Sequence, residues 1–298
     1  MALAPPETLS PSKVSSFTDC ALAFRLSAID RLPEPPSVAA TRGTLVHLAL
    51  EHLFEREPAG RTRENSVLDL ERATTAMRTD PDFTGLGLDA DAESTFFDEA
   101  AKLLRNYFDL EDPTTIRPIG LELRLEAKVG DLRLRGIIDR LELDEDGGLV
   151  VTDYKTGRSP GQTYQQNKLG GVTFYALLCE ELFGVLPSRI QLLYLGDTTA
   201  LTTEPTEQAT RALRNKTRAL WNAVETACER EDFRPKPGPL CNWCSFHAFC
   251  PAQGGDLGLV AAAVAANQAA ATEVDVVGTT SQGADHGQTT SSVDVLDG

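Results

Sequence analysis

The sequence predicts an α/β fold, a central mixed sheet flanked by helices, and two changes of hydrophobic period lead to this prediction. Apolar residues follow helical spacing up to about residue 110 and alternate with polar residues from residue 118 onward. Helical spacing returns at residues 161–183 and again at residues 205–230. With 298 residues, the chain is long enough for one large domain or two small ones.

Three helices are expected before the strands, at residues 10–31, 41–57 and 93–110. The first begins at Ser-Pro-Ser, a favourable N-terminal signal, and ends before the prolines of residues 33–36. The second ends before Pro58, because proline cannot continue a helix. The acidic stretch that follows, residues 61–92, is expected to form loops and a short helix.

Alternating or continuous apolar patterns predict four strands, at residues 118–128, 132–144, 149–155 and 188–196. Val129-Gly130-Asp131 is typical of a tight turn between the first two strands. Residues 144–148, Asp-Glu-Asp-Gly-Gly, predict a second turn, which leads into the third strand. These strands are expected to form the sheet, with helices 41–57, 93–110 and 161–183 flanking it.

We expect residues 9–252 to form the folded domain, with the acidic stretch 61–92 as an insertion. Residues 253–298 are rich in Ala, Gly, Thr and Ser and lack aromatic residues, which predicts a mostly disordered tail. An Ala-rich helix around 258–272 is the exception that the composition allows. The chain has no run of ~18 apolar residues and no secretion signal at its start, so we expect a cytoplasmic protein without a membrane anchor.

The formal net charge is −16, from 28 basic and 44 acidic residues, and it is unevenly distributed. Residues 64–99 and residues 251–298 carry most of the excess acid, while residues 117–140 and 211–236 are mildly basic. The total charge argues against a protein that coats nucleic acid non-specifically, because such coating needs a net basic face. A locally basic groove remains compatible with this distribution.

The hairpin at residues 132–155 brings two carboxylates together. If its turn is centred on Asp146, Asp139 lies opposite Asp153, and Lys155 points to the same face of the sheet. Apolar residues are expected around them on that face: Ile137, Leu141, Leu143, Leu149 and Val151. Two opposed carboxylates favour a cation between them, and Mg²⁺ or Mn²⁺ suits oxygen ligands. The alternative is a surface hairpin in which Asp153 pairs with Lys155 or Arg140.

The predicted helix 41–57 offers a further ligand. His47 and Glu51 are four residues apart and therefore lie on one helix face. His47 is either a metal ligand or an ordinary helix histidine, and the spacing alone leaves both interpretations open. Glu122, on the strand face opposite Leu121 and Leu123, is interpreted as an exposed strand acid.

The chain has six cysteines: Cys20, Cys179, Cys228, Cys241, Cys244 and Cys250. The last three are closely spaced and, without a secretion signal, are better explained by metal binding than by disulfides. Cys20 could supply a fourth thiolate for an iron–sulfur cluster, or His247 could complete a zinc site, and the spacing does not decide between them. Cys179 is expected in the core, and Cys228 in the core or on a helix surface.

Five segments together resemble the RecB-like and Cas4-like exonucleases of the PD-(D/E)XK nuclease superfamily. They are Leu9–Lys13 with Cys20, Arg42–His47 continuing to Leu50-Glu51, Gly136–Arg140, Asp153–Gly157, and the cysteines Cys241, Cys244 and Cys250. The likeness runs from about Leu9 to Ala252. It implies a restriction-endonuclease-like core and a metal-dependent DNA exonuclease that acts in DNA repair or recombination.

The resemblance also implies roles for individual residues. His47, Asp139, Asp153 and the Tyr154 carbonyl would bind Mg²⁺ or Mn²⁺, and Lys155 would be the catalytic lysine. Supporting roles would fall to Glu51, Glu122 and Tyr175. The four cysteines Cys20, Cys241, Cys244 and Cys250 would bind a [4Fe–4S] cluster that joins the N-terminal and C-terminal segments.

The partner implied by the resemblance is DNA, either single-stranded or at duplex ends. The sequence contains no G-x4-G-K-[ST] motif, so any helicase that assists the nuclease would be a separate protein. Two other hypotheses stay open: a non-catalytic iron–sulfur module that binds single-stranded DNA or a helicase, and a zinc-stabilised structural protein.

The sequence departs from the family pattern at one position. The family usually has Gln four residues before the tyrosine that is Tyr175 here, and this chain has Gly171. Nearby glutamines are two to three helical turns too early to replace it: Gln162, Gln165 and Gln166. Catalytic efficiency or substrate handling is therefore expected to differ from the family's.

Overall fold

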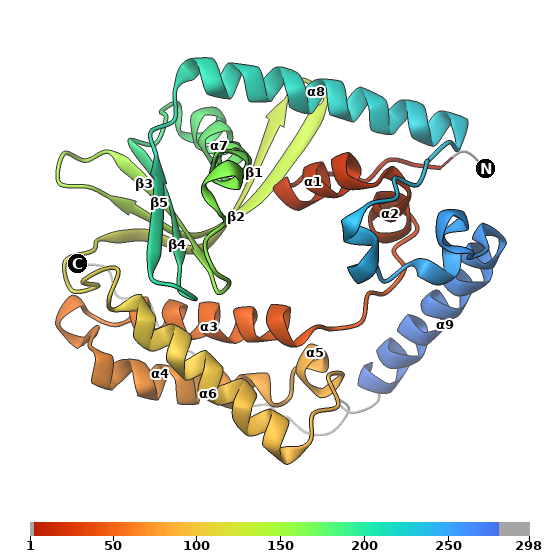
Figure 1. Cartoon of the computed structure of the whole chain (residues 1–298). Helices are drawn as coiled ribbons and strands as arrows, with labels where there is room; N and C mark the ends of the chain where they lie inside the picture. The colour runs from red at the N-terminus through yellow and green to blue at the C-terminus, as the bar shows by residue number, and fades with distance from the viewer. Residues whose placement is uncertain (1–2, 280–298) are drawn as a thin grey trace, which may run out of the picture.

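The structure, a computed structural model, describes residues 3–279, apart from the side chains of residues 162–170 and 270–279 (Figure 1). The helices before the sheet are α1 (Pro11–Asp19), α2 (Ala21–Phe24), α3 (Val38–Glu55), α4 (Arg63–Met77), α5 (Pro81–Thr84) and α6 (Ala90–Tyr107). The strands are β1 (Pro118–Val129), β2 (Leu132–Leu143), β3 (Leu149–Lys155), β4 (Arg189–Tyr194) and β5 (Thr199–Thr203). The remaining α-helices are α7 (Gln162–Phe183), α8 (Glu207–Arg230) and α9 (Val260–Thr279).

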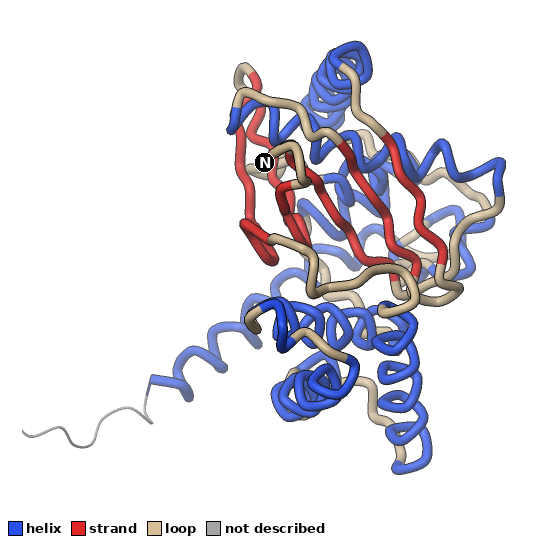
Figure 2. The backbone as a smooth tube through the Cα atoms, turned by 90° about the vertical axis from the view of Figure 1, so that its left-hand side faces the viewer, coloured by secondary structure: helices blue, strands red, loops and turns tan. Residues whose placement is uncertain are grey.

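The five strands form one mixed sheet in the order β1-β2-β3-β4-β5. Strands β1, β2 and β3 pair antiparallel through tight turns, and β3 pairs parallel with β4. Parallel strands need a crossover connection, which α7 supplies between β3 and β4. Figure 2 shows the strands side by side, with helices behind them and a second group of helices below. The predicted α/β fold with a mixed sheet is therefore confirmed.

Each face of the sheet is covered by different helices. On one face, α7 packs its buried residues, including Phe174, Leu177 and Leu178, against the apolar side chains of β1, β2, β3 and β4. On the other face, α3, α4 and α6 pack around Tyr154, Leu193 and Leu195. The strand that carries Asp153 and Lys155 is thus held between two apolar layers, which limits its movement.

A third apolar cluster joins the two ends of the described chain. Leu22, Phe24 and Leu26 near the N-terminus pack with Phe246 and Val260 near the C-terminus. In Figure 1 the blue C-terminal segment accordingly lies beside the red helices α1 and α2. The cysteine-rich segment is a series of short 3₁₀ turns within this cluster: Pro239–Trp243, His247–Phe249, Pro251–Gln253 and Leu257–Leu259.

The structure differs from the sequence prediction in the acidic stretch 61–92. This stretch contains the 15-residue helix α4 rather than loops with one short helix. Its buried face includes polar residues, among them Ser66 and Asp69, which weakens the apolar periodicity on which the prediction depended. Arg56 explains the burial of Asp69, because its guanidinium donates hydrogen bonds of 2.8–2.9 Å to both carboxylate oxygens.

Two other segments were predicted incompletely: strand β5 and the C-terminal tail. Strand β5 was not predicted, because its five residues, Thr-Ala-Leu-Thr-Thr, are polar and only partly buried at the sheet edge. In the tail, the Ala-rich helix is present as α9, and the expected disorder beyond residue 279 lies outside the described residues. Within the described part of the chain, no helix is long and apolar enough to cross a membrane.

Candidate metal and active site

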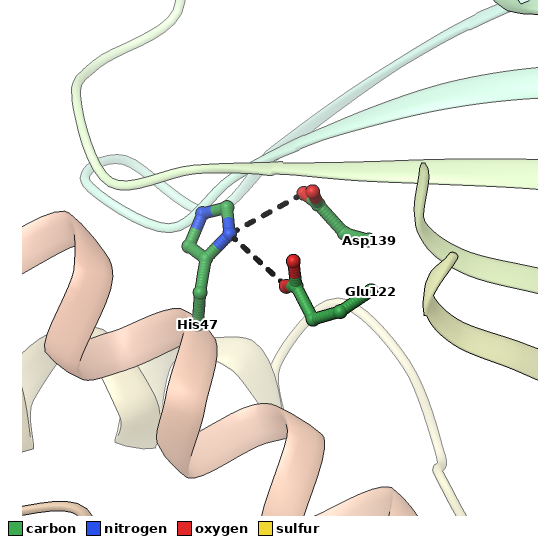
Figure 3. A group of neighbouring side chains, drawn as sticks. All are labelled: His47, Glu122 and Asp139. Carbon is green, nitrogen blue, oxygen red and sulfur yellow. Dashed lines mark ion pairs between the residues drawn. The ribbon is translucent and has the colours of Figure 1, made fainter. Parts of the chain in front are cut away.

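Three ligand-type side chains from three elements meet at one point beside the sheet. His47 on α3 points toward Glu122 on β1 and Asp139 on β2 (Figure 3). His47 Nδ1 lies 3.8 Å from Glu122 Oε1 and 3.5 Å from Asp139 Oδ2. One ligand atom from each residue lies within 4.8 Å of the other two. This spacing is suitable for a shared cation.

The two strands change face where they carry the acids. Residues two apart on a regular strand share a face, yet Leu121 packs with the α3 layer and Leu123 with the α7 layer. Ile138 and Arg140 are divided between the same two sides, because Ile138 packs with the α7 layer and the Arg140 guanidinium lies over Phe54 of α3. Glu122, between the two leucines, has a φ of 43°, in the left-handed region that non-glycine residues rarely occupy.

The pairing of the strands places Glu122 opposite Asp139. Leu121 pairs with Arg140 and Leu123 pairs with Ile138, so the distorted positions of β1 and β2 coincide. This distortion lets both acids approach α3 rather than lie flat against one face, which is a common use of strand irregularities near functional sites. Glu122 is half-buried and lies 3.8 Å from His47, which differs from the position expected of an ordinary exposed strand acid.

The predicted register of the hairpin is confirmed. Arg140 pairs with Thr152 and Leu143 with Leu149, which centres the turn on Asp146. The ladder ends at Arg140, and the next residue, Asp139, accepts a hydrogen bond of 2.7 Å at Oδ2 from the backbone N–H of Tyr154. Asp139 is thereby fixed beside the residue that follows Asp153.

The apolar surroundings are less complete than the sequence predicts. Leu141 and Val151 are buried, but Ile137 and Leu143 are each 39% exposed. The pairing of β2 with β3 stops at Arg140, so the predicted apolar face is not continuous around Asp139.

Asp153 and Lys155 lie on the α7 side of β3. Asp153 is buried, forms an ion pair with Lys155, and accepts a hydrogen bond of 3.4 Å from the hydroxyl of Tyr175. The pairing of Asp153 with Lys155 is the contact expected of an ordinary hairpin. Here the Asp153 carboxylate is buried and adjoins the other acids, whereas the Lys155 side chain is 44% exposed.

The acids and His47 perturb one another electrostatically. Burial lowers the pKa of His47, but the neighbouring carboxylates of Glu122 and Asp139 outweigh burial, so the pKa is raised. Burial, together with the charge of Asp153, raises the pKa of Asp139 to about 7. Carboxylates crowded in this way favour a bound cation, since it offsets both their desolvation and their mutual repulsion.

Lys155 is a cation in this setting. Burial lowers its pKa, but the charge and hydrogen bond of Asp153 more than compensate, so the pKa of Lys155 is raised overall. A lysine with a raised pKa stays protonated near neutral pH and cannot serve there as a general base. Its ammonium group can instead hold a water molecule or stabilise negative charge.

No sequence pattern indicates the buried network of polar side chains behind the site. Arg140, next to Asp139, is completely buried and donates hydrogen bonds of 2.9 Å to both Glu111 oxygens and of 2.7 Å to the Tyr154 hydroxyl. It also forms an ion pair with Glu142, and Gln191 donates a hydrogen bond of 2.7 Å to Glu111. The network ties the strand of Asp139 to β3 and β4. Only a three-dimensional structure could show that this arginine turns inward.

A groove opens beside His47 and Glu122. It has a volume of about 540 Å³, and its lining includes Gly43 and Glu51 of α3 together with Arg124 and Ile137 of the β1–β2 hairpin. Glu51 lines the groove but does not belong to the group of ligand atoms within 4.8 Å of one another. Burial, followed by the charge of Glu122, raises the pKa of Glu51. Glu51 is therefore close to the group without being part of it.

The remaining predicted site residues can be placed individually. The Tyr154 side chain is buried against Arg140, and its ring lies edge-on to His47 at 5.8 Å between centroids. Gly171, where the family usually has Gln, is exposed on α7, and a Cβ atom there would meet nothing within 4 Å. The side chains of the three glutamines at residues 162, 165 and 166 lie outside the described residues.

The donor set fits a divalent cation. One imidazole nitrogen and two carboxylates are within reach of one ion. A set of nitrogen and oxygen ligands suits Mn²⁺ better than Mg²⁺. Asp153 lies beside this group rather than within it. The geometry therefore supports His47, Glu122 and Asp139 as ligands, with Asp153 adjoining them.

The four cysteines that the resemblance assigns to a cluster lie around a second pocket, which is lined by different segments of the chain from the groove beside His47. This pocket, of about 450 Å³, is lined by Cys20, Cys241, Cys244 and Cys250. The backbone N–H of Lys236 donates to Cys20 Sγ at 3.5 Å, and that of Gly238 donates to Cys241 Sγ at 3.4 Å. Burial, and to a smaller extent the other three thiols, raises the pKa of Cys244.

The positions of these sulfur atoms can be compared with those that a zinc site requires. Tetrahedral zinc holds thiolates at ~2.3 Å, which places their sulfur atoms ~3.8 Å from one another. Among the described residues, no three of the cysteine sulfurs lie within 4.8 Å of one another. His247 contacts the Cys241 carbonyl oxygen through Nε2 at 2.5 Å and does not complete such a group. Cys179 and Cys228 are buried in the apolar core.

The family is shown by a match to its sequence model. The model of the PD-(D/E)XK nuclease superfamily matches residues 8–251, which include every element from α1 to the 3₁₀ turn His247–Phe249. The chain therefore belongs to the PD-(D/E)XK nuclease superfamily. Its five-stranded mixed sheet flanked by helices is consistent with the core of that superfamily.

Relatives extend along most of the chain. The chain is 24% identical over 292 residues to the Gene 69 protein of Mycobacterium phage L5, which covers 81% of this chain and 95% of that protein. It is 25% identical over 269 residues to the Gene 69 protein of Mycobacterium phage D29, with 81% and 96% covered. A crystal structure of a protein from Eubacterium rectale, named as a candidate exonuclease, has a similar fold. Its TM-score is 0.52 at 10% identity, over 80% of this chain and 87% of that one.

Proposed function

We propose that this protein is a metal-dependent DNA exonuclease that hydrolyses phosphodiester bonds in DNA repair or recombination. The observation that carries the proposal is the convergence of His47, Glu122 and Asp139 beside the Asp153–Lys155 pair. Membership of a nuclease superfamily supports a DNA substrate. The exonuclease activity and the pathway follow from the sequence resemblance, as does the expectation of a cytoplasmic enzyme assisted by a separate helicase.

Each residue has a distinct role in the proposed reaction. His47, Glu122 and Asp139 would hold Mg²⁺ or Mn²⁺, and Asp153 with the Tyr154 carbonyl would complete the ligands. When bound, the cation supplies Lewis-acid activation of the scissile phosphate and of water. Lys155 holds its ammonium group beside Asp153, where it can position the water and stabilise charge that develops on the phosphate. Tyr175 fixes the orientation of Asp153 through its hydroxyl.

We also propose a [4Fe–4S] cluster bound by Cys20, Cys241, Cys244 and Cys250. The four thiols around one pocket support it, and so do the backbone N–H groups directed at two of the sulfurs. The role inferred for the cluster is to join the N-terminal and C-terminal segments.

The test is cleavage of end-labelled DNA by the full-length protein purified without oxygen. Single-stranded and duplex oligonucleotides labelled at either end are incubated with Mg²⁺ or Mn²⁺, or with EDTA. We expect metal-dependent shortening from one end, and a loss of at least ~10²-fold in rate for Lys155→Ala, because general-acid or electrostatic groups commonly contribute that much. Intact DNA with both metals, and equal behaviour of wild type and Lys155→Ala, would overturn the proposal.

Retention of DNA without cleavage would favour the alternative function of a binding module. In that case the protein should bind single-stranded DNA or a helicase while the label stays intact. A visible absorption spectrum of the same preparation tests the cluster separately. A colourless protein with one zinc and no iron per chain would contradict the [4Fe–4S] proposal and favour a zinc-stabilised structure.

A further inference from the structure

The outer face of the β1–β2 hairpin carries a row of basic side chains. In both strands buried and exposed residues alternate strictly beyond the acids, so one face packs on α7 and the other meets solvent. The exposed face displays six residues: Arg124, Glu126, Lys128, Arg133, Arg135 and Ile137. Four of these six side chains are cations and one is an anion, although the whole chain has a net charge of −16.

Cross-strand pairing makes this row continuous. Arg124 pairs with Ile137, Glu126 with Arg135 and Lys128 with Arg133, so the side chains lie next to one another across the two strands. The Glu126 carboxylate forms its ion pair with Arg133. Among the residues that the structure describes, Arg124, Lys128 and Arg135 take part in no ion pair. These three cations are therefore available to an anionic partner.

A neighbouring segment adds to the positive charge. Leu9 pairs with Leu134 at the free edge of β2, which brings the start of α1 alongside Arg135. Lys13 of α1 lies close enough to Arg135 and Arg31 that, after burial, these two charges lower its pKa. Like charges from three segments are thus gathered where an anion would relieve their repulsion.

The basic row begins at the candidate active site. Arg124 and Ile137 line the groove that also contains His47 and Glu122. From Arg124 to Lys128 is four residues of extended strand, a distance of ~13 Å away from the groove. The row of basic side chains, called the phosphate track below, therefore has one end in this groove and the other end at the tip of the hairpin.

We propose that Arg124, Lys128 and Arg135 bind the phosphate backbone of the DNA strand that enters the groove. This inference rests on the proposed nuclease function and adds the path of its substrate. Exposed lysines and arginines with no acidic partner are the side chains that contact phosphates, and such contacts position DNA without reading its sequence. The binding should therefore depend on salt and be independent of base sequence.

The test compares two triple variants with equal changes of charge. Arg124→Gln, Lys128→Gln and Arg135→Gln are combined in one, and exposed residues of α8 are neutralised in the control: Arg211→Gln, Lys216→Gln and Arg218→Gln. The dissociation constant of labelled single-stranded and duplex oligonucleotides is measured in EDTA over a range of salt concentrations. Binding without metal separates this test from catalysis.

For the hairpin variant we expect affinity to fall at least ~10-fold relative to the α8 control. Loss of three phosphate contacts should lower the slope of log affinity against log salt by ~2 for a single strand and ~3 for a duplex. The slope thus also indicates which form of DNA lies on the hairpin. Arg124→Lys with Arg135→Lys should retain the wild-type slope, because lysine keeps the charge.

Equal effects of the hairpin and α8 variants would overturn the inference. If wild type binds DNA in this way but cleaves none with Mn²⁺, the proposed catalytic function fails while the phosphate track stands. If wild type binds no DNA, both fail. If wild type cleaves DNA but the salt dependence of DNA binding is the same in wild type and the hairpin variant, only the phosphate track is overturned.

Discussion

Asp139 is the residue at which burial and charge act most strongly against ionisation. In the folded, metal-free chain burial raises the pKa of Asp139 to about 7, whereas an unfolded aspartate ionises near pH ~4. The stability that the folded chain gains by holding this proton is fully present below the pKa of Asp139 in the unfolded chain. It is lost as the pH rises through the pKa of Asp139 in the folded chain. Raising the pH through this window should therefore destabilise the metal-free protein.

Asp139→Asn should remove this loss of stability, because asparagine cannot ionise. In EDTA we expect the variant to exceed wild type by about 4 kcal/mol in free energy of unfolding at pH ~8, with the difference vanishing below pH ~4. Chemical denaturation across that range measures it. Added Mn²⁺ should stabilise wild type more than the variant, by mass action. A difference that does not change with pH would contradict this account.

Arg140 is the second residue with a specific energetic consequence. Arg140→Met should lower the free energy of unfolding by about 3–5 kcal/mol, because the carboxylates of Glu111 and Glu142 lose the buried cation with which they pair. Adding Glu111→Gln and Glu142→Gln to Arg140→Met should recover part of this loss. Urea denaturation of the three proteins checks both effects. If the added glutamines lower stability further, the ion pairs are not the source of the loss.

At the scale of residues, sequence reasoning identifies only part of the site. The turn signal at residues 144–148 predicts the register that brings Asp139 near Asp153, and the family motif includes His47. Glu122 could not be assigned, because its position depends on a local distortion of both strands that leaves no periodic pattern. Arg140 could not be assigned either, because an arginine is usually exposed unless buried partners are known.

The contact between β2 and α7 depends on the absence of a side chain at Gly136. A Cβ atom there would lie 2.7 Å from Leu178 Cδ1 and 3.3 Å from Tyr175 Cε1, and Leu178 is fully buried. Gly136→Ala should therefore cost about 1–3 kcal/mol in stability by overpacking. It should also shift Tyr175, whose hydroxyl contacts Asp153. The free energy of unfolding, measured with denaturant, checks the first effect.

Gly171→Ala on the same helix is the matched control. A Cβ atom at that position meets nothing within 4 Å, so the substitution should raise stability by roughly 0.5–1 kcal/mol through helix propensity alone. Opposite signs for the two Gly→Ala variants would support the packing described for α7. If both variants lower the free energy of unfolding by a similar amount, close packing at Gly136 does not account for the effect.

At the scale of elements, long periodic segments were predictable and short or polar ones were not. Strands β1 to β4 and helices α3, α6, α7 and α8 follow from period and turn signals. Helix α4 buries polar residues through tertiary ion pairs, and β5 is a short edge strand, so neither has a clear apolar pattern. Tertiary contacts decide these two elements.

For the whole molecule, the proposed cluster would join segments that lie more than 200 residues apart in the sequence. Loss of this link should separate α1 and α2 from the C-terminal cluster that they pack against. We expect Cys20→Ser to lose most of its bound iron and to lower Tm by several degrees, because closing a long loop restricts the unfolded chain. Iron content and thermal unfolding of anaerobically purified protein measure these effects.

Cys228→Ala provides the control for that experiment. Cys228 is buried in the same apolar cluster but does not line the pocket of the four cysteines. This variant should lose some stability from the cavity it creates and keep its full iron content. Equal iron in Cys20→Ser and Cys228→Ala would contradict the assignment of Cys20 as a ligand.

The charge of the whole molecule is compatible with DNA binding once its distribution is known. The acidic stretch 64–99 forms α4, α5 and most of α6, which pack together behind α3. Some of its acids are neutralised by ion pairs, such as Arg78 with Glu93 and Arg42 with Glu99. The basic hairpin lies on different elements, so we expect the acidic helices to face away from the DNA.

The central claim is that His47, Glu122 and Asp139 hold the metal that the reaction uses. The measurement that tests it most directly is the initial rate of single-stranded DNA cleavage against Mn²⁺ concentration, for wild type and His47→Ala. Loss of one ligand should raise the half-saturating Mn²⁺ concentration at least ~10-fold, since even outer ligand partners contribute 10–100-fold. The same half-saturating concentration in both proteins would contradict the claim.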